Sequence, residues 1–278
     1  MHNAALGALG LNWRYLAFDV HPENLRTAID AAKALQFIGL NLTVPHKVLA
    51  VEMMDELDEA ARTWGAVNTV RFEARDAGGE WKPLAEFGDD VPAAIRSRGF
   101  NTDADAIIHA LHAELDPQLL RGAGVLLLGA GGAGRVAALR LAAEGVGVLN
   151  LVNRTAQKTE KLAGEIRRRY PQLQVNIGYP KGSIDVVINA TSLGLEPGDA
   201  MPLDESRFSL RQARAAYDMI YRPAETPFLK SAKAAGCLAA NGLGMLLYQG
   251  AKAQELWTGQ PAPIAVMRRA LEANIYGH

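Results

Sequence analysis

Apolar residues near the start of the chain alternate between short runs and stretches with a helical period. Leu25, Ile29, Ala32 and Leu35 recur at intervals of three and four residues, as on one face of a helix. The expected elements are a strand over 13–20, a helix over 23–35, a strand over 37–43 and a helix over 46–58. Strands that alternate with helices predict a mostly parallel sheet in this region.

The same alternation returns after a polar stretch. Residues 73–97 are rich in turn formers and are expected to form a surface loop or hairpin. Val125-Leu126-Leu127-Leu128 is a continuous apolar run, typical of a strand buried on both faces. Further strands are expected over 148–152, 186–188 and 215–220, and helices over 135–145, 244–257 and 263–275. This order predicts an α/β protein with a Rossmann-like domain, and the last two helices are expected to pack back on the N-terminal domain.

Composition and charge narrow the class of protein. Hydrophobic residues make up 49% and charged residues 21%, which favours a packed core over disorder. The net charge of −1 gives no broad attraction to nucleic acid or to an anionic membrane. We therefore expect a small-molecule partner, with no nucleic acid and no membrane, and the pattern leaves open a monomer or a homodimer.

Cysteine usage and the N-terminal residues indicate a cellular compartment. The single cysteine, Cys237, cannot form an internal disulfide, which fits a reducing environment. Its apolar neighbours favour a buried structural role over that of a nucleophile. The first residues lack the basic start and apolar core of a secretory signal, and no apolar run reaches the ~18–20 residues of a membrane span. A cytoplasmic protein is expected.

A glycine-rich loop follows the apolar run that ends at Leu128. It reads Gly129-Ala130-Gly131-Gly132-Ala133-Gly134 and stands between an expected strand and an expected helix, as a dinucleotide-binding loop requires. Glycines at the first two motif positions let the backbone turn tightly and approach a pyrophosphate, and the third permits close helix–strand contact. The N–H groups of the helix N-terminus then face the phosphates.

The residues after the next strand indicate which dinucleotide is bound. NAD sites place an Asp or Glu about 20 residues beyond the loop, where it bonds the ribose 2′-hydroxyl. This chain has Asn153-Arg154-Thr155 there, with Lys158 one helical turn later. A carboxylate would repel a 2′-phosphate, whereas Arg154 can stack on the adenine and pair with that phosphate, and Lys158 adds positive charge. The cofactor is predicted to be NADP rather than NAD.

Six further motifs carry a resemblance to the shikimate dehydrogenases, in the order of that family and over about the whole chain. They are Asn41-Leu42-Thr43-Val44-Pro45-His46-Lys47, Gly65-Ala66-Val67-Asn68-Thr69, Asn101-Thr102-Asp103, Asn189-Ala190-Thr191-Ser192, Asp218-Met219-Ile220-Tyr221-Arg222-Pro223 and Asn241-Gly242-Leu243-Gly244-Met245-Leu246-Leu247-Tyr248-Gln249. The resemblance implies NADP-dependent, reversible reduction of 3-dehydroshikimate to shikimate in aromatic amino-acid biosynthesis. It also implies a substrate domain over 1–104 and 240–278 and an NADP domain over 105–239.

The resemblance also implies residue roles. Lys47 would be the proton donor at the carbonyl oxygen, with Asp103 beside it, since an ammonium can polarise a carbonyl and a carboxylate can hold the ammonium in place. The remaining implied contacts are Thr43, Asn68 and Gln249 with ring hydroxyls, Tyr221 with the carboxylate, and Thr191 and Met245 with the nicotinamide. For Tyr221 a purely structural core position stays open. No metal site is expected.

The chain departs from the family at its N-terminus. Relatives carry a strand and a Ser-x-Ser-Pro segment just before Met1-His2-Asn3, and those serines hold the substrate carboxylate. Either the recorded start lies too late, or the chain binds its substrate differently. Each lost hydrogen bond to a charged group costs about 1.5–3 kcal/mol, so we expect poor activity for residues 1–278 as written and recovery when upstream sequence is restored.

Three other functions compete with this interpretation. A related dehydrogenase could prefer quinate or accept both acids, but it would typically favour NAD through an acidic residue that is absent here. A non-catalytic NADP-binding protein would have no use for Lys47 and Asp103, although the missing serines keep this alternative open. A glutamyl-tRNA reductase could share the glycine loop and Asn-Arg-Thr, but the near-neutral charge and Val44-Pro45-His46-Lys47 speak against it.

Overall fold

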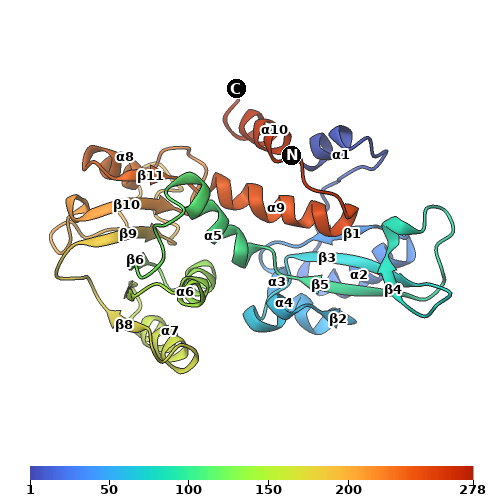
Figure 1. Ribbon diagram of the computed structural model, residues 1–278, viewed down its shortest axis with the longest axis horizontal. Helices are drawn as coiled ribbons and strands as arrows, with labels where there is room; N and C mark the ends of the chain where they lie inside the picture. The colour runs from blue at the N-terminus through green and yellow to red at the C-terminus, as the bar shows by residue number, and fades with distance from the viewer. Residues whose placement is uncertain (278) are drawn as a thin grey trace. The chain divides into compact units, whose positions relative to one another are not determined.

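Two units of chain fold around separate sheets in the computed structural model, which describes residues 1–277 (Figure 1). The first unit comprises Met1–Asp103 and Gln249–His278, and the second unit comprises Ala104–Tyr248. The chain passes from the first unit to the second at the start of α5 (Asp103–Glu114). It returns to the first unit within α9 (Leu243–Thr258). Each unit is described by itself below.

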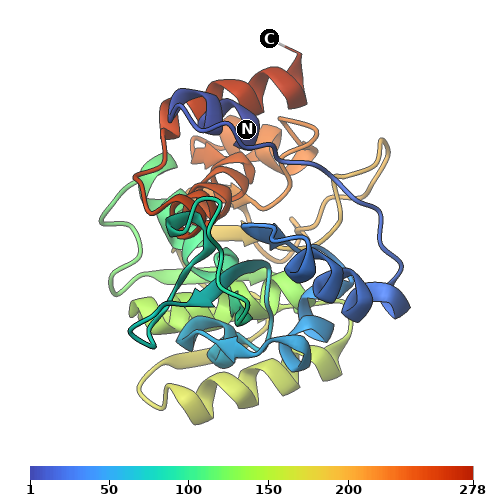
Figure 2. The ribbon, with the colours of Figure 1, turned by 90° about the vertical axis from the view of Figure 1, so that its right-hand side faces the viewer.

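The sheet of the first unit has the strand order β1-β3-β5-β2, with β4 paired to β3. Its strands are β1 (Gly39–Asn41), β2 (Glu56–Leu57), β3 (Thr69–Arg75), β4 (Trp81–Pro83) and β5 (Ile95–Phe100). Besides the last part of α9, its helices are α1 (His2–Ala8), η1 (Pro22–Asn24), α2 (Leu25–Ala34), α3 (His46–Leu49), η2 (Ala50–Met53), α4 (Glu59–Trp64), η3 (Leu84–Glu86) and α10 (Ile264–Tyr276). Helix α1 lies beside α10 (Figures 1 and 2).

The expectation of a mostly parallel sheet is wrong for the first unit. β3 pairs antiparallel with β1, β4 and β5, and only β2 and β5 are parallel. The stretch expected to form a surface loop or hairpin, 73–97, begins within β3 and ends within β5. The antiparallel pairing of β3 with β4 confirms the hairpin alternative. The charged residues of this stretch made the alternation of a strand hard to recognise in the sequence. Phe72 and Ala74 lie in the core, whereas Arg71 and Glu73 lie on the other face of the sheet.

The strand expected over 13–20 does not form, because a strand needs a neighbouring backbone to bond. The main chain of Tyr15 bonds the side chain of Asn3 instead: Asn3 Nδ2 donates to the Tyr15 carbonyl at 2.9 Å, and Tyr15 N–H donates to Asn3 Oδ1 at 2.7 Å. Leu16 and Phe18 in this segment are exposed. The alternation of side chains therefore marks no buried strand face here.

The helix expected over 46–58 is cut short. α3 passes into η2, and Met54 is already extended, with φ −86° and ψ 142°. The apolar residues Met54 and Leu57 cover Gly99 of β5, where a Cβ would lie 2.7 Å from Met54 Cγ and 3.1 Å from Leu57 Cδ2. Tertiary packing on the sheet thus overrides the helical spacing of this segment.

The helix expected over 23–35 is confirmed as η1 and α2, and it covers one face of the sheet. Leu25, Ile29 and Ala32 are buried against the inward residues of β3, Val70 and Phe72. Burial of a leucine, isoleucine, valine or phenylalanine side chain stabilises a fold by roughly 1.5–3 kcal/mol.

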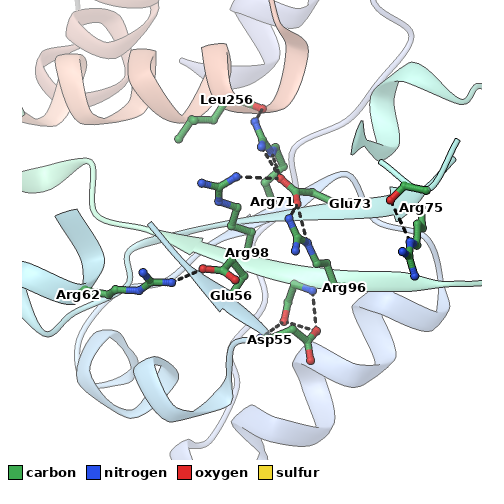
Figure 3. A network of polar contacts seen from close by, with 11 residues as sticks. Asp55, Glu56, Arg62, Arg71, Glu73, Arg75, Arg96, Arg98 and Leu256 are labelled. Carbon is green, nitrogen blue, oxygen red and sulfur yellow. Dashed lines mark hydrogen bonds and ion pairs between the residues drawn. The ribbon is translucent and has the colours of Figure 1, made fainter. Parts of the chain in front are cut away.

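The other face of β3 and β5 carries a buried carboxylate among three arginines (Figure 3). Glu73 is fully buried and accepts from Arg71 of its own strand and from Arg96, which stands directly opposite on β5. Arg98 Nη1 lies 3.8 Å from Glu73 Oε1, and Arg71 Nη1 also donates to the Leu256 carbonyl of α9 at 3.4 Å. Since Arg71 and Arg98 are themselves cross-strand partners, Glu73 offsets their mutual repulsion.

Replacement of Glu73 by glutamine is expected to lower the free energy of unfolding by about 3–5 kcal/mol, because it leaves partly buried guanidinium groups without an anion. Urea denaturation checks this expectation. The matched control is Glu23→Gln, whose carboxylate is exposed and which should change stability by less than about 0.5 kcal/mol. Equal stability of the Glu73→Gln variant and the unchanged chain would show that the cluster contributes nothing.

The second unit holds a parallel sheet with the strand order β11-β10-β9-β6-β7-β8. Its strands are β6 (Gly124–Leu128), β7 (Val148–Val152), β8 (Gln174–Ile177), β9 (Ile184–Asn189), β10 (Ala213–Asp218) and β11 (Leu238–Ala240). Besides α5 and the first part of α9, its helices are α6 (Gly132–Glu144), α7 (Ala156–Arg169), η4 (Leu210–Gln212) and α8 (Pro227–Ala234). The order reverses at β6, as in a doubly wound nucleotide-binding sheet.

Strands expected in this unit over 125–128, 148–152, 186–188 and 215–220 match β6, β7, β9 and β10. On one face, Leu126, Val187 and Ala216 pack with Phe228 and Leu229 of α8. None of the helices in residues 1–277 combines the length and the hydropathy of a membrane span.

Candidate active site

Lys47 and Asp103 form an ion pair at the end of the first unit's sheet. Lys47 Nζ donates to Asp103 Oδ2 at 2.7 Å, and the two side chains are 29% and 19% exposed. Lys47 lies on α3, just after β1, whereas Asp103 opens α5 immediately after β5. The fold thus joins two residues 56 positions apart in the sequence, and both keep enough exposure to meet a small molecule.

Asn68 lies next to this pair and is almost completely buried. Its Oδ1 accepts from the Thr102 N–H at 2.8 Å, and its Nδ2 donates to Thr102 Oγ1 at 2.9 Å and to Gln249 Oε1 at 3.5 Å. The neighbouring Val67 N–H donates to the Lys47 carbonyl at 2.8 Å. Lys47, Asn68, Asp103 and Gln249 are therefore brought together by direct bonds or by adjacent residues.

Two polar residues that the sequence analysis gave no role complete this network. Thr102 forms hydrogen bonds with both polar atoms of the Asn68 side-chain amide. Asn41 Nδ2 donates to the Asn68 carbonyl at 3.2 Å and to Thr69 Oγ1 at 3.0 Å. Thr102 directly precedes Asp103, and Asn41 lies two residues before Thr43, so both belong to motifs of the family resemblance. Their signal was present, but a threonine or an asparagine beside a catalytic candidate does not show from sequence that its side chain bonds another site residue.

Thr43 differs from the other candidates because its side chain is exposed. Its carbonyl accepts from the His46 N–H at 2.8 Å, which shapes the turn before Lys47. The adjacent Leu42 N–H donates to the Asn68 carbonyl at 2.8 Å. Thr43 therefore lies at the rim of the same cluster. His46 is held at its ring, where Nε2 contacts the Val20 carbonyl at 2.9 Å, so its role here is structural.

The glycine loop of the second unit has two tightly packed and two open positions. Gly129 adopts φ +106°, and a Cβ there would lie 2.8 Å from the Ala190 carbonyl oxygen. A Cβ on Gly134 would lie 2.2 Å from the Gly129 carbonyl oxygen, so α6 approaches the loop as closely as glycine allows. A Cβ on Gly131 or Gly132 would meet open space.

The open side of this loop fits a dinucleotide pyrophosphate. α6 begins with no side-chain cap and no acidic residue in its first turn, so its first N–H groups are available to an anion. Ala130 and Ala133 complete the loop, and the Ala130 N–H donates to Asn153 Oδ1 at 3.1 Å. Asn153 thus couples the loop to the segment after β7.

Arg154, Thr155 and Lys158 follow β7 and are exposed at the start of α7. Asn153 Nδ2 donates to the Thr155 carbonyl at 3.0 Å and fixes the turn that carries Arg154. No acidic residue stands in the first turn of α7. The two cations Arg154 and Lys158, with the hydroxyl of Thr155 between them in sequence, can bind a 2′-phosphate.

The remaining candidates of the second unit lie at the carboxyl ends of β9 and β10 and in α9. Thr191 is half-buried, and its Oγ1 donates to Asn189 Oδ1 at 2.7 Å. Tyr221 is 37% exposed, which is more than a core tyrosine would be. Met245 lies in the first turns of α9 and is half-buried. The carboxyl ends of parallel strands are where such sheets bind ligands.

A doubly wound sheet with an open glycine loop, together with a paired lysine and aspartate in a second α/β unit, defines a dinucleotide-dependent oxidoreductase. Sequence profiles agree with this class. The profile for the shikimate dehydrogenase substrate binding domain matches residues 1–70, that for shikimate / quinate 5-dehydrogenase matches 112–195, and that for the shikimate 5′-dehydrogenase C-terminal domain matches 242–272.

Full-length relatives identify the family. The shikimate dehydrogenase (NADP(+)) of Methanopyrus kandleri is 39% identical over 98% of this chain and 89% of its own length. A crystal structure of a shikimate dehydrogenase in complex with NADP+ matches with a TM-score of 0.81 and 35% identity, over 99% of this chain and 89% of that one. The 5-ketofructose reductase of a Gluconobacter strain matches with a TM-score of 0.79 and 33% identity, over 98% and 92%. The chain belongs to the shikimate dehydrogenase family.

Proposed function

We propose that the chain catalyses the NADP-dependent, reversible reduction of 3-dehydroshikimate to shikimate, a step of aromatic amino-acid biosynthesis. The observation that carries this proposal is the Lys47–Asp103 ion pair beside Asn68 and Gln249, in a chain whose relatives include NADP-dependent shikimate dehydrogenases. We assign the Lys47–Asp103 pair and the contacts with ring hydroxyls to the first unit, and cofactor binding to the second.

Lys47 is the general acid of the reduction and the general base of the oxidation. In reduction its ammonium donates a proton to the carbonyl oxygen of the substrate as that oxygen becomes a hydroxyl. In oxidation the neutral amine takes the hydroxyl proton back. Asp103 holds the amine in place through the 2.7 Å bond. When bound, the reduced cofactor NADPH would supply the hydride for reduction, and the oxidised cofactor NADP+ would accept the hydride in oxidation.

Neutral groups of the first unit suit a polyhydroxylated ring. Thr43, Asn68 and Gln249 can each donate and accept hydrogen bonds, which is the capacity that ring hydroxyls require. The amide of Asn68 is fixed by Thr102 on both of its polar atoms, so its orientation is set before substrate arrives. Preorganised groups of this kind lower the entropic cost of binding. We assign the substrate carboxylate to Tyr221 of the second unit, which is 37% exposed.

In the second unit, the loop from Gly129 to Gly134 holds the pyrophosphate of NADP. Arg154, Thr155 and Lys158 bind its 2′-phosphate, and Asn153 ties these two parts together through Ala130. Thr191 and Met245 contact the nicotinamide. The missing carboxylate after β7 supports NADP over NAD at this position.

We place the enzyme in the cytoplasm as a monomer or a homodimer. Cys237 is buried and unpaired, its Sγ lies 3.3 Å from the Leu210 carbonyl, and burial raises the pKa of its thiol. A thiol in this state suits a reducing compartment and needs no catalytic role. The small net charge gives no support for nucleic acid as a partner.

The function is tested by initial rates on the purified chain with shikimate, quinate and 5-ketofructose, each with NADP(H) and with NAD(H). We expect shikimate with NADP to give the highest kcat/KM. Faster turnover of quinate with NAD, or of 5-ketofructose, would reassign the substrate. Thermal-shift titration separates a further alternative: stabilisation by NADP with no turnover of any substrate would indicate a non-catalytic NADP-binding protein.

A further inference from the structure

Asp218 is a fully buried carboxylate for which the reaction described above has no use. It ends β10 and stands directly beside Asn189, the last residue of the neighbouring strand β9. The groups that donate to it are neutral: the Ile220 N–H at 3.0 Å, Asn189 Nδ2 at 3.0 Å and the Thr226 hydroxyl at 2.6 Å. Burying such a group is costly, which favours a functional role for it.

The first consequence of Asp218 is the orientation of the Asn189 amide. Asn189 Nδ2 points to two acceptors, Asp218 Oδ1 and the Leu193 carbonyl at 3.2 Å. Asn189 Oδ1 therefore faces Thr191 and accepts from its N–H at 3.0 Å and from its hydroxyl at 2.7 Å. A flipped amide would set oxygen against oxygen on one side and N–H against N–H on the other.

The second consequence is the position of Thr191 against the cofactor loop. The Ala190 carbonyl oxygen and Thr191 Cγ2 lie 2.8 Å and 3.1 Å from the place that a Cβ on Gly129 would occupy. Thr191 Oγ1 also accepts from the Leu193 N–H at 3.1 Å, which closes the turn after β9. A change in the Asn189 amide would therefore reach the backbone that packs on Gly129.

We propose that Asp218 is a positioning residue for NADP: its acceptor oxygen fixes the Asn189 amide, which holds Thr191 against the glycine loop. The same oxygen bonds the Ile220 N–H, next to Tyr221. The required property is an acceptor at this point, not a negative charge. This inference rests on the proposed contact of Thr191 with the nicotinamide.

Two substitutions separate the acceptor from the charge. In Asp218→Asn the amide oxygen can keep the bonds to Asn189 and Ile220 while its NH2 group turns to Thr226 Oγ1, which can accept. Asp218→Leu has similar size and no acceptor. We expect Asp218→Leu to raise the Kd and KM for NADP about tenfold or more, the scale of an unsatisfied buried donor, and Asp218→Asn to change them less than about threefold.

Thr226→Val is the structural control, because it removes the bond to the other carboxylate oxygen and the N-cap of α8. It should lower Tm while the Kd for NADP stays within about twofold of the unchanged chain. Thr191→Val replaces Asp218→Leu in the test if Asp218→Leu does not fold. It removes only the hydrogen bonds of the Thr191 hydroxyl, and it should also raise the Kd for NADP.

Calorimetric titration with NADP reads out binding without turnover, so the test stands even where the proposed reaction fails. An unchanged Kd for NADP in Asp218→Leu with a lowered Tm would overturn the proposal, as would an unchanged Kd in Thr191→Val. Equal damage by Asp218→Asn and Asp218→Leu would show that the charge matters and would overturn the acceptor argument.

Discussion

Replacement of Lys47 by alanine is expected to lower kcat for shikimate oxidation by about 10²–10⁴-fold, the range that a general acid or base contributes. KM for shikimate should change much less, because Asn68 and Gln249 retain their contacts and Lys47 acts mainly where the proton moves. Steady-state rates with saturating NADP give both constants.

The control for this substitution is Lys33→Ala, which removes a lysine of the same unit that is also paired with a carboxylate, Asp55, at 2.5 Å. It should leave kcat unchanged. A Lys47→Ala variant with nearly normal kcat and a strongly raised KM would show that Lys47 only binds the substrate. A fall in kcat in both variants would point to damaged folding rather than lost proton transfer.

Replacement of Arg154 by alanine is expected to raise KM for NADP by about 10–100-fold and to leave KM for NAD nearly unchanged. One charge-assisted hydrogen bond is worth about 1.5–3 kcal/mol, and each 1.4 kcal/mol corresponds to tenfold in affinity. The 2′-phosphate is the only group that distinguishes the two cofactors, so the loss should appear with NADP alone.

Arg168→Ala is the matched control for Arg154, since it removes an arginine from the last turn of the same helix, α7. It should leave both KM values unchanged. Equal increases in KM for NADP and NAD in the Arg154→Ala variant would mean that the side chain contacts the adenine or the pyrophosphate instead. No change with either cofactor would remove Arg154 from the cofactor site.

The second unit could be predicted well from the sequence because its signals are local. A continuous apolar run such as 125–128 has few structural options, and a glycine loop that follows it directly is constrained by sterics that glycine alone satisfies, as Gly129 and Gly134 show. The motif residues Lys47, Asn68, Asp103 and Gln249, selected through the resemblance, also lie in one cluster.

The first unit was predicted less well because its structure depends on contacts distant in sequence. Glu73 looks like a surface residue in the sequence, yet it is buried by Arg71 and Arg96. Met54 has helical spacing but packs on Gly99 of another strand. The roles of Thr102 and Asn41 follow from the position of Asn68. No local sequence pattern indicates a hydrogen-bond partner that comes from a distant part of the chain.

The most direct test of the central claim is a double-mutant cycle of Lys47→Ala and Asp103→Asn, read as kcat for NADP-linked shikimate oxidation. If the two residues act as one proton-transfer pair, the double variant should be no slower than Lys47→Ala by more than about threefold, because removing either partner already disables the pair. Losses that multiply in the double variant would show two independent contributions and would contradict the pairing.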